Sequence, residues 1–165
     1  MSILSDQDII FRLENRPMKI EPFREKNLTP NGYDLTIAEV YTRNPEGKVT
    51  IGQVYLNPGD WCLVSTEEYL MVPPNLCGML FMRSSFIRKG LIAGFGMVDA
   101  GFKGTLTFSV KNIGPEQVAL PIGERICQIA FQELSSNPQK LYGARSGTYQ
   151  DQNGVTLDGG KKVLD

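Results

Sequence analysis

The sequence contains no histidine, and this absence limits the chemistry that the chain can perform. Histidine is the side chain that changes charge near neutral pH, so acid–base catalysis falls here to a carboxylate, a lysine, a tyrosine or a thiol. The three cysteines, Cys62, Cys77 and Cys127, are far apart in the sequence and have no histidine to complete a zinc set. A zinc-hydroxide mechanism is therefore disfavoured, and this odd, sparse set predicts buried structural thiols in a reducing cytoplasm.

The chain also lacks a long apolar run and a strong net charge. No window approaches the ~20 apolar residues that a membrane span needs, and no basic stretch precedes an apolar one at the N-terminus. The net charge of -1 gives no long-range attraction to nucleic acid or to an anionic membrane surface. We therefore expect a cytoplasmic protein with no nucleic-acid or membrane partner, which binds anions through local groups.

Glycine and proline divide the sequence into short segments that are typical of strands. There are 17 glycines and 10 prolines in 165 residues, and the runs between them have strand length. In residues 105–111, Leu106, Phe108 and Val110 alternate with polar residues, as in a half-buried strand. Further strands are expected at residues 33–40, 53–56, 61–65, 78–82, 117–120 and 125–131. The pattern predicts an all-β domain, either a sandwich, a jelly roll or a barrel.

The two ends of the chain depart from this pattern. Ser5, an acidic turn and then Ile9 predict a short N-terminal helix. Beyond about residue 134 the apolar content falls, and Ser, Gly, Gln, Asn and Asp dominate. We expect one β domain over residues 1–134 and a flexible C-terminal arm over residues 135–165, which becomes ordered on a ligand or on a neighbouring subunit.

Two segments carry residue types that suit a phosphorylated ligand. Arg83, Ser84 and Ser85 follow an apolar run, so their guanidinium and hydroxyl groups are available to phosphate oxygens at a strand end. The alternative is a polar strand end with a surface arginine. Asp99 stands between an apolar pair and a glycine turn, where a carboxylate can deprotonate water. Its alternative is an ordinary turn aspartate that bonds nearby amides.

Two weaker signals accompany these segments. Gly94 and Gly96 flank Phe95 and predict a hairpin whose bare backbone a flat ring can approach, although such glycines also mark simple bulges. Residues 145–152, which include Tyr149, are rich in hydrogen-bond donors and form either a lid over an anionic ligand or an unstructured terminus. Residues 101–104 lack the Lys and Ser/Thr pair of a P-loop.

Taken in order, five segments resemble the motifs of the superfamily that contains the trimeric dUTPases and the dCTP deaminases. They are residues 31–35, 83–85, 97–104 with Asn112, 123–128 and the arm segment 149–154. Each is short, but their co-linear order extends over most of the chain. The resemblance implies a distorted β jelly roll of the β-clip, dUTPase-like type. It also implies a homotrimer that binds deoxyuridine or deoxycytidine triphosphate at its subunit interfaces.

The resemblance further implies roles for single residues. Asp99 would be catalytic and would activate water for attack on the α-phosphorus, with Mg²⁺ carried by the triphosphate and no metal site on the protein itself. Phe102 would pack under the deoxyribose, and residues 94–98 would present backbone to the pyrimidine. The residues implied to bind substrate are Arg83, Ser84, Ser85, Arg88, Gly94, Phe95, Gly96, Met97, Val98, Phe102, Lys103, Gln128, Tyr149 and Gln152.

Position 109 separates the two branches of this superfamily. Deamination of dCTP relies on a glutamate ten residues after the aspartate, and this chain has Ser109 there. A hydroxyl group is a poor proton shuttle at neutral pH, which favours dUTP pyrophosphatase activity. Phe102, Arg88 and residues 149–152, however, resemble the deaminase branch. The alternatives are dCTP deamination, alone or coupled to hydrolysis, and a trimer that binds deoxynucleotides without catalysis.

Overall fold

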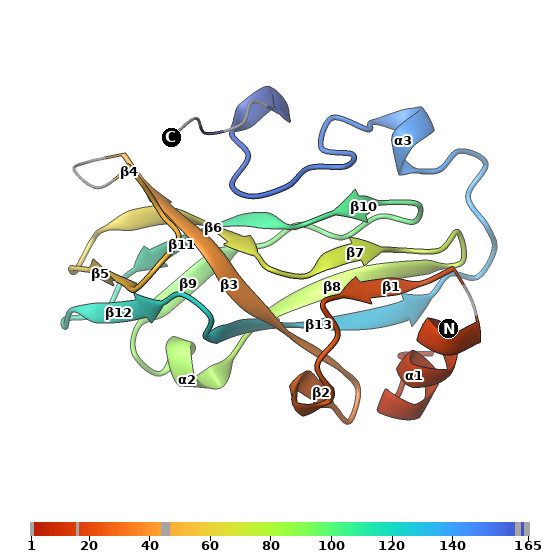
Figure 1. The fold of residues 1–165 in the computed structure, drawn as a ribbon, viewed down its shortest axis with the longest axis horizontal. Helices are drawn as coiled ribbons and strands as arrows, with labels where there is room; N and C mark the ends of the chain where they lie inside the picture. Colours follow the sequence, from red (N-terminus) through yellow and green to blue (C-terminus); the bar gives the residue numbers. More distant parts are fainter. Residues whose placement is uncertain (1, 16, 44–46, 161–162, 164–165) are drawn as a thin grey trace.

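The structure of this chain is a computed structural model that describes residues 2–15, 17–43, 47–160 and 163 (Figure 1). Strands dominate it, and the predicted all-β class and N-terminal helix are confirmed. In chain order the elements are α1 (Asp6–Asn15), β1 (Lys19–Glu21), η1 (Glu25–Asn27), β2 (Leu28–Thr29), β3 (Gly32–Thr42), β4 (Gly47–Val49), β5 (Gln53–Leu56), β6 (Trp61–Thr66), β7 (Tyr69–Met71), β8 (Leu76–Met82), α2 (Ser84–Ile87), β9 (Leu91–Gly94), β10 (Lys103–Gly104), β11 (Thr107–Asn112), β12 (Val118–Pro121), β13 (Arg125–Glu133), α3 (Tyr142–Arg145) and η2 (Asp158–Gly160).

The strands form one large sheet and two small ones. The large sheet has eight strands, with the path β8-β13-β3-β6-β11-β9 and with β2 and β4 paired to β3. β1, β7 and β10 form a three-stranded sheet, and β5 pairs with β12. Every one of these pairings is antiparallel. Gly78 of β8 bridges Val98, which follows β9, so the two edges of the large sheet approach each other in a distorted jelly roll.

Strand β11 has one buried side and one side on the outer face of the large sheet. Phe108 and Val110 are buried, whereas Thr107 and Ser109 are partly exposed. This alternation confirms the predicted half-buried strand. Ser109 stands directly beside Gly94 of β9, its partner in the strand register. The polar side of β11 therefore lies on an outer surface, while its apolar side contributes to the core.

The N-terminal helix begins where the sequence predicts it. The backbone N–H of Asp8 donates to Ser5 Oγ at 3.2 Å, and the N–H of Ser5 donates to Asp8 Oδ2 at 3.1 Å, which is a reciprocal N-terminal cap. Ile9 packs into the core with no exposed surface. Arg12 forms an ion pair with Glu133 at the end of β13, so the helix is fixed to the large sheet by both an apolar and a charged contact.

The described residues beyond β13 lie against the same chain. Gln152 forms a parallel bridge with Gly104, and Thr105 N donates to Gln152 O at 3.0 Å. Gly154 N donates to Thr105 Oγ1 at 3.1 Å, and Val155 is buried. Figure 1 shows this segment, in blue, running alongside β10. Residues 141–156 thus add a bordering wall to the outer face of the large sheet, and their predicted closure over a nucleotide stays a prediction.

The three cysteines have the surroundings that their sequence neighbours predict. Cys62, Cys77 and Cys127 are free and buried. Burial raises the pKa of the Cys62 thiol to about 12, so this thiol is protonated and unreactive at neutral pH. The prediction of buried structural thiols is confirmed. Among the helices that the structure describes, none is long and apolar enough to cross a membrane.

Candidate functional site

One cavity brings together predicted residues from the third motif and from the C-terminal arm. It has a volume of about 190 Å³, and we call it the Asp99 cavity. Its walls include the loop at residues 96–99, Phe102, Tyr149 and Gln152. These residues therefore share one cavity within a single chain, and their roles in binding substrate stay predictions. Met97 and Val98 lie on the same loop, with Met97 exposed and Val98 buried.

The loop that carries Asp99 is held by backbone contacts at both ends. Gly78 N donates to Val98 O, and Val98 N donates to Gly78 O, each at 2.8 Å. A Cβ at Gly78 would lie 3.1 Å from Val98 Cβ and 2.7 Å from Ile129 Cδ1, so a side chain there would crowd the loop and the neighbouring strand. Gly101, at φ +85°, then reverses the chain. Asp99 is presented between these two points, and its side chain is exposed in the single chain.

Tyr142 connects the arm to the base of the Asp99 cavity, although the sequence analysis did not single it out. Its ring packs edge to face on Phe102, with ring centroids 5.5 Å apart. Its hydroxyl oxygen accepts a hydrogen bond from Tyr149 N at 3.1 Å. Phe102 is itself buried. An aromatic residue in an otherwise polar arm was the available sequence signal, because such a ring needs an apolar partner.

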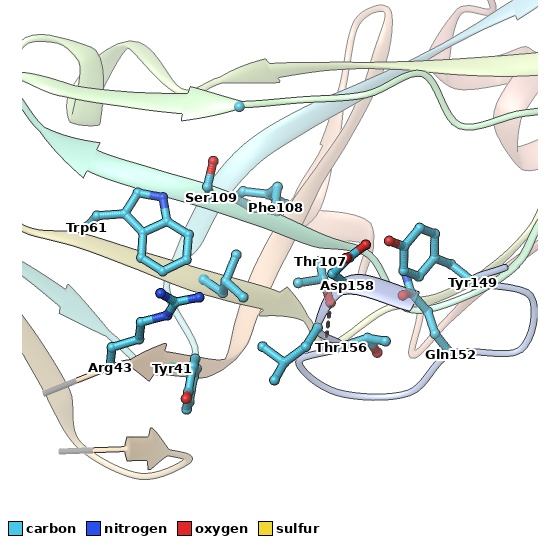
Figure 2. A pocket seen from close by; sticks show the side chains of 13 residues that line it. Tyr41, Arg43, Trp61, Thr107, Phe108, Ser109, Tyr149, Gln152, Thr156 and Asp158 are labelled. Carbon is cyan, nitrogen blue, oxygen red and sulfur yellow. Dashed lines mark hydrogen bonds between the residues drawn. The ribbon is translucent and has the colours of Figure 1, made fainter. Parts of the chain in front are cut away.

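A larger cavity adjoins the Asp99 cavity on the outer face of the large sheet. Its volume is about 670 Å³, and we call it the sheet-face cavity. Figure 2 shows Trp61 and Arg43 at one end and Tyr149 and Gln152 at the other. The two cavities share four wall residues, Thr107, Phe108, Tyr149 and Gln152. They therefore form one continuous region, large enough for a nucleoside.

The residues that line the sheet-face cavity include Ser109 and few carboxyl groups. Ser109 lies next to Gly94, and a Cβ on Gly94 would be 2.7 Å from Ser109 Oγ. Among the described residues, Asp158 supplies the one carboxyl group that lines this cavity. Phe95 does not face a ligand with its ring, because the ring packs on Phe108 at a centroid distance of 5.0 Å. Its backbone remains available, as the sequence predicts.

A second group of predicted residues lies around Arg83, and it is highly charged. Arg83 Nε is 3.1 Å from Asp34 Oδ2, and Arg125 Nη1 is 3.4 Å from the same oxygen. Arg83 Nη1 donates to Arg125 O at 3.0 Å and to Glu124 Oε1 at 3.4 Å. We call Asp34, Arg83, Glu124 and Arg125 the Arg83 cluster. It unites the first, second and fourth motifs, which are distant in the sequence.

The carboxylate of the Arg83 cluster is buried, and its charge is balanced by its neighbours. Asp34 is 5% exposed. Burial raises the pKa of this carboxyl above its ordinary value, while the Arg83 and Arg125 guanidinium groups oppose that rise. The sequence analysis placed Asp34 in a predicted strand at residues 33–40 and gave it no role of its own. The pairing with Arg83 depends on β3 and β8 both flanking β13, which no local pattern in the sequence reveals.

The serines next to Arg83 directly follow a strand end, as the sequence predicts, because β8 ends at Met82. Ser84 and Ser85 open the one-turn helix α2, which was not predicted and which Phe86 anchors in the core. Both serines and Arg88 are exposed. Gln128 donates from Nε2 to Thr29 Oγ1 at 2.5 Å, and its contact with phosphate stays a prediction. The hydroxyl groups beside Arg83 are therefore accessible, whereas the Gln128 amide already has a partner.

The two groups of residues are far apart in one chain. Gly78, which bridges Val98, and Arg83 are five positions apart along β8, which corresponds to about 17 Å at ~3.3 Å per residue. Figure 1 shows α2 and α3 on opposite sides of the molecule. Lys103, also predicted to bind substrate, lies on the arm side, where its N–H donates to Gln150 Oε1 at 3.2 Å. A single subunit thus holds two separate half-sites.

The donor set fits a metal ion that arrives with a ligand better than a resident one. The described residues contain no group of three or more His, Cys, Asp and Glu side chains that could hold a metal ion. Mg²⁺ on a triphosphate needs only one or two carboxylates, because phosphate oxygens and water complete its shell. Asp99 is exposed and meets that need. Asp34 does not, because two guanidinium groups already neutralise it.

The comparisons with known sequences agree with one another on the family that this chain resembles. Residues 46–134 match the family described as dCTP deaminase-like. The chain is 34% identical to a dCTP deaminase of Halorubrum lacusprofundi, over 92% of this chain and 88% of that protein. It is 36% identical to a "dCTP deaminase, dUMP-forming" of Coprothermobacter proteolyticus, over 92% of each. It is 34% identical to the "Probable deoxyuridine 5'-triphosphate nucleotidohydrolase" of Sulfolobus islandicus rod-shaped virus 1, over 94% and 97%.

Comparison with solved structures supports the same fold. The 2'-deoxycytidine 5'-triphosphate deaminase of Agrobacterium tumefaciens superposes with a TM-score of 0.65 at 19% identity. That match covers 78% of this chain and 46% of the other, so this chain spans less than half of its length. The EIAV dUTPase superposes with a TM-score of 0.53 at 22% identity, over 74% and 92%. At these identities the likeness concerns the fold alone.

Proposed function

This chain belongs to the dCTP deaminase-like family, and from that premise we propose that it hydrolyses dUTP to dUMP and pyrophosphate. The observation that carries the proposal is Ser109, which lines the sheet-face cavity at the position where the deaminase branch has a glutamate. A hydroxyl group does not take a proton from water and return it to a leaving amine at neutral pH as a carboxyl group does. The viral relative named as a dUTP nucleotidohydrolase supports the same reaction.

In this proposal the two half-sites have different tasks. The Asp99 cavity receives the nucleoside, with Phe102 under the deoxyribose, Tyr149 closing the cavity and the backbone of residues 94–98 toward the pyrimidine. Asp99 orients and deprotonates the water that attacks the α-phosphorus. Arg83, with the two serines that follow it, binds the phosphate oxygens. Mg²⁺ carried by the triphosphate neutralises charge on those oxygens.

We further propose a homotrimer in the cytoplasm, with each site shared between subunits. Arg83 and the Gly78 bridge are about 17 Å apart along β8, so we place the Arg83 cluster of one subunit beside the Asp99 cavity of another. Apolar side chains are exposed at the Arg83 end of the molecule, among them Phe81 at 53% and Ile87 at 53%. Such side chains are typical of surfaces that another subunit covers.

The test is a product assay with dUTP, dCTP, dTTP and UTP, each with and without Mg²⁺. We expect pyrophosphate and dUMP from dUTP in the presence of Mg²⁺, and no ammonia from dCTP. Pyrophosphate from dUTP at the rate of a mock purification would refute the proposal. The comparison of dUTP with UTP reports whether the cavity around Phe102 selects the deoxyribose, because a 2'-hydroxyl group would have to fit against that buried ring.

A second candidate function is dCTP deamination, and the names of the relatives favour it. Relatives 34–38% identical to this chain are named dCTP deaminases, and one is named as dUMP-forming, which combines deamination with hydrolysis. This reaction requires a proton shuttle other than Ser109. Asp158 is the carboxyl group that the described part of the chain places on the sheet-face cavity. Release of ammonia from dCTP, abolished by Asp158→Asn, would establish this candidate.

A further inference from the structure

The Arg83 cluster contains a buried carboxylate, which is energetically unfavourable in a surface site for phosphate. Asp34 is a carboxylate with 5% exposure, and removing such a charge from water costs several kcal/mol unless its partners compensate. It also places a negative charge directly beside the guanidinium group that is proposed to bind an anion. Coulomb's law alone would make the site weaker for phosphate with Asp34 than without it. The geometry of Arg83 gives a reason for its presence.

Most of the Arg83 guanidinium group is engaged by the protein. Nε pairs with Asp34 at 3.1 Å, and Nη1 donates to the Arg125 carbonyl oxygen at 3.0 Å and to Glu124 at 3.4 Å. Nη2 donates no hydrogen bond to the part of the chain that the structure describes. Because the guanidinium group is planar and rigid, fixing Nε and Nη1 also fixes the direction of Nη2.

Arg125 is the second cation that contacts the Asp34 carboxylate. Its Nη1 lies 3.4 Å from Asp34 Oδ2 and also donates to the Lys26 carbonyl oxygen at 3.1 Å. Asp34 is therefore tied to a second cation that is itself anchored to the backbone. Arg83 retains about a quarter of its side-chain exposure, at 25%. One edge of an otherwise immobilised guanidinium group thus remains open to solvent, beside the exposed Ser84 and Ser85.

We propose that Asp34 is a positioning residue, which holds Arg83 so that its Nη2 edge is fixed toward the triphosphate of the substrate. This inference rests on the proposed function, because it takes Arg83 as a phosphate-binding residue. Asp34 does not touch the ligand. It reduces the conformational entropy that a free arginine would lose on binding a phosphate, at the cost of a weaker net charge.

The experiment uses the fact that net charge and positioning predict opposite changes in triphosphate affinity when the Asp34 charge is removed. Asp34→Asn keeps the shape of the side chain and removes its charge. If net charge governs affinity, the variant binds a triphosphate more tightly than the wild type does. If positioning governs it, the dissociation constant of α,β-imido-dUTP with Mg²⁺ rises about tenfold, the loss of roughly one charged hydrogen bond. Titration calorimetry measures it, and competition with deoxyuridine, which has no phosphate, is expected to show no change.

Glu116→Gln is the control, because it removes the same charge from an exposed position outside the Arg83 cluster. Glu116 is not a partner of Arg83 in the hydrogen bonds and ion pairs of the described residues. We expect its dissociation constant for α,β-imido-dUTP to stay within twofold of the wild type. An equal loss in both carboxylate variants would overturn the proposal, since the buried and the exposed acid would then be equivalent.

A double-mutant cycle with Arg83→Lys tests whether Asp34 acts through Arg83. Lysine keeps the charge but has no fork for Asp34 to orient. We expect Arg83→Lys alone to weaken α,β-imido-dUTP binding about tenfold, and Asp34→Asn to add less than twofold to it. Additive losses, or wild-type affinity in Arg83→Lys, would overturn the proposal. If Asp34→Asn does not fold, as judged by its thermal unfolding, the Arg83→Lys result decides.

The outcome is separable from that of the proposed function. All of these measurements are of binding and require no turnover. If the product assay shows dCTP deamination instead of dUTP hydrolysis, the cycle is repeated with dCTP, because both nucleotides carry the same triphosphate. Loss of affinity in Asp34→Asn together with no dUTP hydrolysis would retain the positioning role and reject the proposed reaction. Wild-type affinity in Asp34→Asn together with normal dUTP hydrolysis would reject the positioning role and retain the proposed reaction.

Discussion

The two half-sites of this protein are built from opposite kinds of residue. The Asp99 cavity is formed by Phe102, Tyr142 and Tyr149, and the carboxylate of Asp99 stands exposed at its edge. The Arg83 cluster has a buried carboxylate inside and cations around it. The Asp99 cavity therefore provides an aromatic surface and an exposed carboxylate, and the Arg83 cluster provides guanidinium groups in fixed orientations. A nucleoside triphosphate, apolar at one end and anionic at the other, matches this pair.

The comparison extends to the contacts that hold each half-site in place. The Asp99 cavity depends on the arm, which several hydrogen bonds hold to the domain, among them Thr105 N to Gln152 O at 3.0 Å and Val155 N to Glu39 Oε2 at 2.8 Å. The Arg83 cluster is fixed by interactions among three strands and a loop, with both charges of Asp34 and Arg83 satisfied. Within one chain, both half-sites are therefore held by several contacts. The largest predicted effect therefore concerns chemistry, and smaller ones concern these supports.

Replacement of Asp99 is expected to have the largest effect. Asp99→Asn keeps the size of the side chain and removes the proposed base, so kcat for dUTP should fall by roughly 10² to 10⁴ with little change in KM. Pyrophosphate release measures the rate. Asp6→Asn, an exposed change in α1, is the control and should retain the wild-type rate. Equal rates at the background level would favour the non-catalytic, nucleotide-binding trimer, and equal rates above it would show that Asp99 is not the base.

Mixing two inactive variants tests whether the half-sites meet across subunits. Asp99→Asn and Arg83→Ala each destroy one half. If every site takes Asp99 from one subunit and Arg83 from the next, co-expression in equal amounts should restore about a quarter of the wild-type activity, since this fraction of interfaces combines two intact halves. If both halves serve a site within one chain, no interface is repaired. The activity of the unseparated mixture is the measurement, and mixed trimers isolated by two different affinity tags should retain about a third, because one of their three interfaces is repaired.

Much of this arrangement follows from local sequence, and the remainder depends on long-range pairing. The alternation of Leu106, Phe108 and Val110 predicted β11 because a half-buried strand imposes that period. The Ser5 cap likewise predicted α1. The sequence did not predict α2, because a four-residue helix anchored by Phe86 has no helical periodicity to detect.

The candidate site shows the same division. Asp99, Phe102 and Tyr149 were predicted from the resemblance and do line one cavity. The partners that fix the predicted residues were not predicted. Asp34 reaches Arg83 because β13 pairs with both β3 and β8, and Tyr142 reaches Phe102 because the arm folds back. Such contacts join residues 40 or more positions apart, where a single sequence carries no signal.

Removing the Tyr142 hydroxyl should weaken the nucleoside half moderately. Tyr142→Phe keeps the ring on Phe102 and loses the acceptor for Tyr149 N. Because one hydrogen bond contributes about 1 kcal/mol, KM for dUTP should rise about fivefold while kcat changes little. Tyr55→Phe, an exposed residue on β5, is the matched control and should have no effect. An unchanged KM in Tyr142→Phe would show that the arm is positioned by its other contacts.

The smallest expected effect concerns Glu68, a second buried carboxylate that lacks the partners of Asp34. Glu68 is fully buried; its Oε2 accepts from Thr36 N at 2.8 Å, but its Oε1 has no hydrogen bond, and the nearest Arg24 nitrogen is 3.9 Å away. Burial raises the pKa of Glu68 above its ordinary value of 4.5. The folded protein therefore retains a proton that the unfolded chain has released, and its free energy of unfolding falls as the pH rises through this window.

Glu68→Gln should remove this loss, because the amide is neutral at every pH and its oxygen can still accept from Thr36 N. At pH 7 we expect the melting temperature to rise by about 2–4 °C for each kcal/mol gained, and at pH 4 to match the wild type more closely. Thermal unfolding at both pH values measures it, with Glu67→Gln on the surface partner of Arg24 as the control. Destabilisation at pH 7 would mean that Arg24 compensates the Glu68 charge despite its distance. Glu68 would then resemble Asp34, as a carboxylate kept for the cation that it orients.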